Sequence, residues 1–274
     1  MMSNVEIRGL SWHRLWEDGW FWRVLAAALV VGFVVGMGNF VLELSFRLTG
    51  SAGGLALGSA GGLTPAALVV IAWGLAALLV LLSVRFMLAA CQTWGLSRLY
   101  LKVVRDDRER WFEESFVGFK CPFEAFWLIS LQSLVISLWT LLFIVPGIIA
   151  ALRYSMVWYV RADNPDWTAR QCMDESARIM EGRKWSFVVF IFSYWKWLVA
   201  LVALLVAGLS LVGLGCYVAF SNAYAWIVPV ILLGLPIFLA FYAVAFVYGF
   251  HSSVGSAAFY CEISREASAA DMSV

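Results

Sequence analysis

The chain has 274 residues, of which 63% are hydrophobic and 14% are charged, whereas about a quarter of the residues are charged in an ordinary soluble domain. This composition excludes a water-soluble globular protein. The net charge of +1 indicates no particular class of partner, and the distribution of the charges along the chain is more informative.

Apolar residues come in blocks that contain no Asp, Glu, Lys or Arg, and the longest extends from Trp197 to Cys261. A span of the bilayer core takes about 20 apolar residues, so this block alone can hold two spans. Backbone amides in hydrocarbon must form hydrogen bonds within the segment, and the blocks lack the alternating polarity of barrel strands. We therefore predict an all-α polytopic membrane protein with a single integral membrane domain over residues 1–274.

About six spans are expected in this domain. They are predicted at about 22–42, 63–84, 126–145, 147–160, 185–212 and 226–250. The first lacks a small-residue cleavage site and is too long for a signal peptide, which indicates an uncleaved span. Pro146-Gly147 predicts a tight hairpin between the third and fourth spans. The fifth has an alternative start at Trp197, which would make residues 185–195 an interfacial helix. Pro229 and Pro236 predict a kink or a weakened helix in the sixth.

Basic residues lie almost entirely on one side of this predicted topology. The segments on that side hold Arg8, Arg14, Arg23, Arg85, Arg98, Lys102, Arg105, Arg108, Arg110, Lys120, Arg161, Arg170, Arg178, Arg183 and Lys184. The opposite side holds Arg47. By the positive-inside rule the basic side is cytoplasmic. We therefore expect both termini to lie in the cytoplasm.

Two cytoplasmic segments have amphipathic patterns, at residues 92–120 and 166–182. In the first, Arg98, Lys102 and Arg105 share one helical face, which predicts a basic helix on the anionic surface of the inner leaflet. The alternative for this face is specific recognition of a lipid head group. It continues into a stripe of Trp111, Phe112, Ser115, Phe116 and Phe119, with Glu113 and Glu114 away from it, which is typical of an interfacial helix. The second follows Asp163-Asn164-Pro165, where proline ends the fourth span. It begins with a Thr168/Gln171 capping box, has an Asp174–Arg178 pair, and ends at a left-handed Gly182.

Two glycine patterns lie in the first half of the chain. The tandem repeat "GSAGGLAL" and "GSAGGL" predicts a flexible outer loop after the first span. Gly32 and Gly36 form a GxxxG pattern, which allows close helix approach either within the monomer or to a second copy or another membrane protein.

An ordered set of short motifs lies between Gly95 and Tyr260. The motifs are "GLSRLYLKVVR", "FVGFK", "LLFIVPGIIAALRYSM", "ADNPDWTARQCMDESARIMEGRKW", Ser193 with Trp197, and "AAFY". With this set the chain resembles an uncharacterised bacterial family of multi-pass membrane proteins known only as a domain of unknown function. The resemblance implies an integral membrane fold, a location in the bacterial inner membrane, and no established activity. The chain departs from the family pattern at Ile191, where an acidic residue is common, and at Phe250-His251, where a Pro-Tyr pair is common.

Few residues suggest chemistry. His13 and His251 belong to no metal-ligand pattern, and the five cysteines form no CxxC pair, so no metal and no cofactor are expected. His251 with Ser252 and Ser253 lacks a GxSxG elbow, and no catalytic residue is assigned. Arg153 lies within a predicted span, where a charge requires a partner or water, and we expect it to face Glu43 or the polar residues of span three.

The predicted ligand site lies in an intramembrane cavity between spans three, four and five. Its candidate residues are Arg153, Tyr154, Ser155, Gln132, Asp163 and Asn164. The leading hypothesis is a non-enzymatic protein that binds or handles a lipid or another amphiphile, or that assists an export assembly. Membrane lipids are the expected partners, and no nucleic acid is expected. The alternatives are a transporter or channel subunit and an intramembrane lipid-modifying enzyme.

Overall fold

The structure is a computed structural model that describes residues 3–59, 65–220 and 227–271. All the regular elements in these ranges are helices, which confirms the predicted all-α class. The chain divides into two compact units. We call residues 19–181 the central unit and residues 1–18 with 182–274 the terminal unit, and we describe each by itself.

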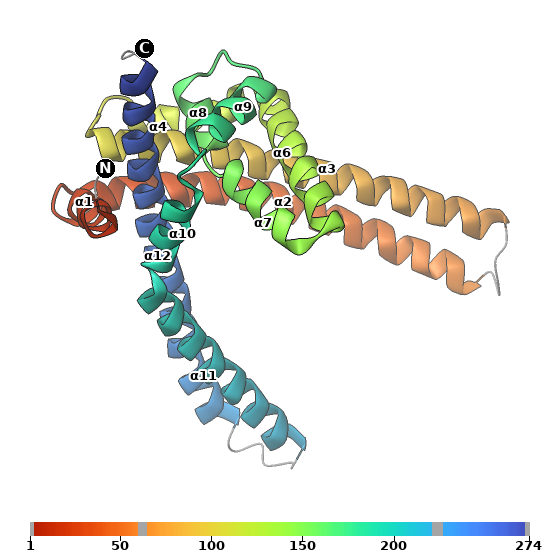
Figure 1. Ribbon diagram of the computed structural model, residues 1–274. Helices are drawn as coiled ribbons and strands as arrows, with labels where there is room; N and C mark the ends of the chain where they lie inside the picture. The colour runs from red at the N-terminus through yellow and green to blue at the C-terminus, as the bar shows by residue number, and fades with distance from the viewer. Residues whose placement is uncertain (1–2, 60–64, 221–226, 272–274) are drawn as a thin grey trace. The chain divides into compact units, whose positions relative to one another are not determined.

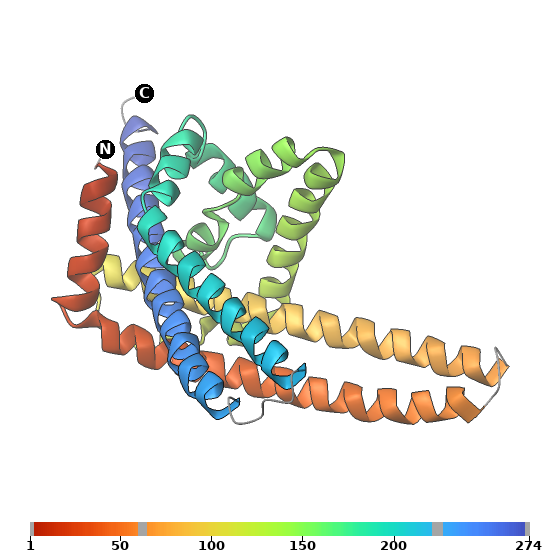
Figure 2. The same ribbon diagram turned by 90° about the horizontal axis from the view of Figure 1, so that it is seen from below.

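The central unit begins with two long antiparallel helices, α2 (Trp20–Ser59) and α3 (Pro65–Arg105). They lie side by side as a hairpin (Figures 1 and 2). The buried stripe of α2 recurs every three or four residues, so one face of the helix packs on α3. That stripe consists of Trp20, Val24, Ala27, Val31 and Val35. Large apolar side chains such as Phe33 and Phe40 remain exposed on other faces, which fits a helix surrounded by lipid.

Helix α2 is longer than the sequence indicated. The first glycine-rich repeat lies within the helix, which continues to Ser59, so the expectation of a flexible loop there is wrong. The rest of the second repeat, at 60–63, lies outside the described residues. A further difference concerns two arginines predicted on opposite sides of the membrane. Arg47 and Arg85 both form ion pairs with Glu43, at 3.1 and 3.9 Å. They therefore lie at one level of the hairpin.

The rest of the central unit consists of shorter helices. Two single-turn helices, α4 (Trp111–Glu114) and α5 (Val117–Lys120), pack on α3. They are followed by α6 (Pro122–Leu142) and α7 (Ile144–Arg153), which form the expected tight hairpin, with its turn at Phe143 rather than at Pro146-Gly147. A β-carbon on Gly147 would lie 2.3 Å from Thr140 Oγ1, so only glycine allows this approach.

The predicted fourth span, residues 147–160, is not one helix. It is divided between α7 and α8 (Val157–Asp163) by a turn at residues 154–156. Helix α8 ends at Asp163, as Pro165 predicted. Helix α9 (Ala169–Ile179) has the predicted Thr168/Gln171 capping box, and Gly182 beyond it has a φ of 73°.

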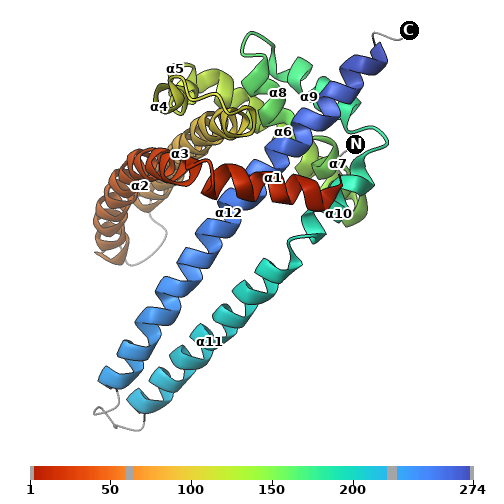
Figure 3. The same ribbon diagram turned by 90° about the vertical axis from the view of Figure 1, so that its left-hand side faces the viewer.

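The terminal unit contains α1 (Asn4–Trp16), α10 (Lys184–Phe192), α11 (Trp195–Phe220) and α12 (Ile227–Asp271). Helices α11 and α12 form an antiparallel hairpin, and α1 packs on α12 (Figure 3). The predicted fifth span is interrupted at Ser193–Tyr194, close to its alternative start. Helix α12 extends well beyond residue 250 and continues through Pro236.

Five helices in the described ranges are long and apolar enough to cross a membrane. Their apolar segments are Trp20–Leu44, Ile71–Arg105, Pro122–Leu142, Trp195–Gly215 and Gly234–Ala269, with mean hydropathies between 1.6 and 2.6. The chain therefore has the character of an integral membrane protein. A β-carbon on Gly32 or Gly36 would meet nothing within 4 Å. The close approach within the monomer that GxxxG allowed is therefore not found at these glycines among the described residues.

Candidate functional site

A cavity of about 750 Å³ in the central unit is the best candidate for a binding site. We call it the Arg161 cavity. Its lining comes from α3, α5, α6, α8, α9 and the loop before α9, and comprises Trp94, Val117, Lys120, Cys121, Phe123, Glu124, Trp127, Leu128, Arg161, Pro165, Asp166, Trp167, Thr168, Ala169 and Arg170. Aromatic side chains and basic groups thus surround one space, which suits a molecule with an apolar part and a polar part.

Arg161 is the buried cation of this cavity, with only 4% of its surface exposed. Its guanidinium donates hydrogen bonds to a carboxylate oxygen of Glu124 and to the backbone carbonyl of Trp167. It also lies over the ring of Trp94, 4.5 Å from the ring centroid. Such a stacked guanidinium gains from the negative face of the indole.

Local sequence explains how these groups meet. Pro122 begins α6, where its missing N–H costs nothing, and Glu124 follows in the first turn, where the helix dipole favours a carboxylate. Pro165 ends α8 soon after Arg161, and the loop then returns so that the Trp167 carbonyl reaches the guanidinium. The carboxylate and the guanidinium are 37 residues apart in sequence.

Two hydrogen-bond donors beside the cavity have no partner among the described residues. They are Nε of Arg161 and Nε1 of Trp94, and both atoms are buried. Buried polar groups in proteins are nearly always hydrogen-bonded, so an unpaired pair of donors is unusual. Nearby, burial raises the pKa of the Cys172 thiol, although the Arg161 charge acts in the opposite direction.

The backbone of α5 and of Ser115 just before it lies very close to the backbone of α3. A β-carbon on Gly118 would lie 2.2 Å from the carbonyl oxygen of Cys91, and one on Gly95 would lie 1.9 Å from that of Ser115. The absence of a side chain at Gly95 and at Gly118 therefore allows the two backbone segments to come into direct contact. This contact positions Val117 and Lys120, which line the cavity.

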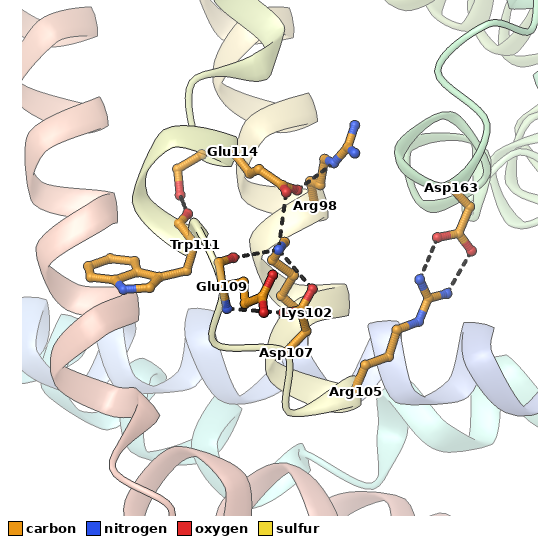
Figure 4. A network of polar contacts seen from close by, with 9 residues as sticks. Arg98, Lys102, Arg105, Asp107, Glu109, Trp111, Glu114 and Asp163 are labelled. Atoms are coloured by element: carbon orange, nitrogen blue, oxygen red, sulfur yellow. Dashed lines mark hydrogen bonds and ion pairs between the residues drawn. The ribbon is translucent and has the colours of Figure 1, made fainter.

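A network of ion pairs lies near the C-terminal end of α3 (Figure 4). Lys102 Nζ contacts carboxylate oxygens of Asp107 at 2.8 Å and Glu114 at 3.1 Å, and donates to the carbonyl of Glu109 at 2.7 Å. Glu114 also accepts from Arg98 at 2.8 Å. Arg105 makes a two-point pair with Asp163, at 2.7 and 2.8 Å. The network ties the loop after α3 and the end of α8 to α3.

The basic residues predicted on the membrane surface, Arg98, Lys102 and Arg105, are the three cations of this network. Each is therefore paired with a carboxylate of the protein. The aromatic stripe that follows is present as a ladder of ring contacts between Trp111, Phe112, Phe116 and Phe119. It is formed by two single-turn helices rather than by one interfacial helix.

The structure brings together four of the six predicted ligand residues, but away from the Arg161 cavity. Gln132 donates to the backbone carbonyl of Tyr154 at 3.0 Å, and Ser155 donates to the carbonyl of Leu152. Arg153 lies over the ring of Tyr154.

The pairing of Arg153 with Glu43, one of the two alternatives expected from the sequence, is not found among the described residues. Arg153 is exposed, and Glu43 pairs with Arg47 and Arg85 rather than with Arg153. Asp163 belongs to the ion-pair network, and Asn164 donates to the carbonyl of Val160. On α9, Arg178 makes a two-point pair with Glu175 instead of the predicted pair with Asp174.

The terminal unit contains a second polar cluster, around the interruption between α10 and α11. Arg8 donates to the carbonyl of Ser193 at 2.5 Å, and Nε2 of His251 lies 3.2 Å from the carbonyl of Arg8. The imidazole makes edge contacts with Trp12 and Tyr194. His251 is thus held by a backbone carbonyl and aromatic rings, in the middle of α12 and not at a helix end.

Sequence reasoning missed the central residues of the cavity. In the sequence, Arg161 is only one of the basic residues that indicate the topology, and no role is predicted for Glu124. No motif links them, because their meeting depends on the path of the chain between α6 and α8. Helix α1 was also missed, although Ser3 and Glu6 form a capping box that could have been recognised.

Within residues 3–59, 65–220 and 227–271, no group of three or more His, Cys, Asp or Glu could hold a metal ion. No protein-family model matches the chain, and no match was found among curated proteins or among solved structures.

Proposed function

We propose that the chain is a membrane-embedded protein that binds an amphiphilic molecule in the Arg161 cavity. The observation that carries this proposal is the combination of exposed aromatic side chains with a buried cation in one cavity. Phe123 is 80% exposed and Trp127 60% exposed, whereas Arg161 is 4% exposed. Both aromatic residues lie in the first two turns of an apolar helix that can span a membrane, so the apolar side of the cavity continues into a lipid-facing surface.

An amphiphile matches both parts of this site. Its hydrocarbon would contact Phe123, Trp127 and Leu128, and its polar part would lie toward the basic side chains Lys120, Arg161 and Arg170. Small-molecule sites in proteins are typically cavities of several hundred Å³ with a mostly apolar lining and a few placed polar groups. The Arg161 cavity has this character. A lipid of the surrounding bilayer is the simplest such ligand.

The same proposal places the protein in a bacterial inner membrane with both termini in the cytoplasm. The uneven distribution of Lys and Arg along the chain supports this orientation. A green fluorescent protein fused to the C-terminus should fluoresce, and a periplasmic alkaline phosphatase fused there should be inactive. The opposite pair of results would refute the orientation.

Native mass spectrometry of the full chain in mild detergent tests the binding. We expect a stoichiometric lipid to remain bound to the wild type and to be lost from Val117→Trp, because the larger side chain fills the cavity. Val199→Trp introduces the same ring on the exposed surface of α11, outside the cavity, and should retain the lipid. Equal lipid retention by both variants would contradict the cavity as the site. Ion flux in liposomes without bound lipid would favour a transporter or channel instead.

A further inference from the structure

We propose that the polar part of the ligand is an anionic lipid head group, and that it binds by replacing Glu124 on Arg161. This inference rests on the proposed function and adds to it the charge of the ligand and the route of entry. Its basis is the geometry of the Arg161–Glu124 pair, in which the two partners differ sharply in exposure.

Arg161 requires an anion at all times. Its side chain is 4% exposed, and Glu124 is its acidic partner among the described residues. A buried guanidinium without a countercharge is strongly destabilising. Since Arg161 also has a donor, Nε, without a partner, one carboxylate does not satisfy all five of its N–H groups.

Glu124 is a partner that can leave. Its side chain is 58% exposed, so it can turn into water without losing much burial. It lies in the first turn of α6, where its charge remains favourable after Arg161 is released. An incoming anion of equal charge would then take its place, and the buried guanidinium would stay paired.

The charges around the cavity favour this exchange. The lining contains three basic residues, Lys120, Arg161 and Arg170, and two acidic residues, Glu124 and Asp166. Once Glu124 has turned away, three basic side chains face a single acidic one. A phosphodiester head group carries one negative charge and several acceptor oxygens, which match a guanidinium fork and the nearby lysine.

The apolar lining identifies the source of the anion as a lipid rather than a free phosphate. Phe123, Trp127 and Leu128 adjoin the basic groups, and inorganic phosphate would gain nothing from them. A zwitterionic lipid would gain from them but would bring its own cation next to Arg161. The proposed site therefore prefers an anionic lipid over both.

Three probes separate these cases with the full chain in detergent: dihexanoyl phosphatidylglycerol, dihexanoyl phosphatidylcholine and inorganic phosphate, titrated by native mass spectrometry or calorimetry. We expect phosphatidylglycerol to bind most tightly. Glu124→Gln should strengthen its binding by about tenfold, because a competing like charge is removed. The affinity for phosphatidylcholine should stay unchanged.

Arg161→Gln should abolish the preference for phosphatidylglycerol. If this buried substitution prevents folding, the double variant Lys120→Gln/Arg170→Gln tests the same preference with the other two basic residues of the cavity. It should weaken the binding of phosphatidylglycerol and leave the binding of phosphatidylcholine unchanged. Arg178→Gln is the matched control, because Arg178 lies on the exposed face of α9 with Glu175 and does not line the cavity.

Failure of this inference differs from failure of the proposed function. Equal binding of both lipids, unchanged by Glu124→Gln, would overturn the anion exchange and leave the amphiphile site intact. Binding of inorganic phosphate as tightly as phosphatidylglycerol would overturn the lipid as the source. No binding of either lipid to wild type or variants would overturn the proposed function itself.

Discussion

Gly95 on α3 lies against the backbone of Ser115 so closely that a β-carbon at Gly95 would be 1.9 Å from the Ser115 carbonyl oxygen. Gly118 makes the reciprocal approach to Cys91. These two contacts hold the segment of α4 and α5 on α3, and this segment carries both Glu114 of the ion-pair network and Lys120 of the cavity. The packing of two backbones thus connects the two polar features of the central unit.

Gly95→Ala should therefore lower the stability of the protein by about 2–3 kcal/mol, since the overpacked backbone must move apart. Thermal unfolding in detergent would show this loss. Gly74→Ala is the control, because a β-carbon there meets nothing within 4 Å and alanine is the better helix former. A Gly95→Ala variant as stable as Gly74→Ala would show that α4 and α5 do not lie against α3.

Lys102 is the central cation of the network and is 9% exposed. Lys102→Met should cost about 1–3 kcal/mol, because Asp107 and Glu114 lose a charged hydrogen-bond donor. Arg178→Met removes one cation from the exposed pair with Glu175, and this change should cost no more than about 0.5 kcal/mol. The comparison of unfolding midpoints for the two variants checks the prediction. Equal losses would mean that the network is no more important than a surface pair.

The network also predicts a dependence on pH. The hydrogen bond from Lys102, with a second from the backbone N–H of Glu109, holds the pKa of Asp107 below its ordinary value of 3.8. A carboxylate with a lowered pKa stabilises the folded state above that ordinary value, and this stabilisation is lost as the pH falls through the lowered pKa. Wild type should therefore unfold at a higher temperature than Asp107→Asn near neutral pH, and the two midpoints should converge below pH 3.8. A difference that persists in acid would contradict the assignment.

The shared pairing of Arg47 and Arg85 with Glu43 makes a prediction about topology. Because all three side chains lie at one level of the α2–α3 hairpin, Arg47→Cys and Arg85→Cys should react with the same one-sided, membrane-impermeant maleimide. The experiment requires a background in which the five native cysteines are replaced. Labelling of the two positions from opposite sides would restore the arrangement expected from the sequence alone.

These examples show which features follow from the sequence and which do not. The helical class, the capping box at Thr168 and the left-handed Gly182 depend on local patterns, and the structure confirms them. The partner of Arg161 depends on how α6 and α8 pack, and nothing near either residue in sequence indicates it. The helix through the first glycine repeat is a further difference, because glycine density predicts flexibility but does not prevent the backbone from continuing an established helix.

The interruption between α10 and α11 gives the last prediction. The carbonyl of Ser193 lies at this interruption and accepts a hydrogen bond from Arg8 of α1, while α1 in turn contacts α12 through Trp12 and His251. Helix α1 thus holds the interruption in place. Arg8→Met should cost about 1.5–3 kcal/mol, the usual contribution of a hydrogen bond that involves a charged group.

Hydrogen exchange measured by mass spectrometry should localise the effect of Arg8→Met. We expect faster exchange at residues 193–198, where Trp197 and Leu198 donate backbone hydrogen bonds to Tyr194. Arg14→Met is the matched control, because Arg14 pairs with Asp18 four residues along the chain. If both variants exchanged alike over residues 193–198, α1 would have no part in fixing this point. A selective increase in Arg8→Met would show that the amino-terminal helix determines where the α11–α12 hairpin begins.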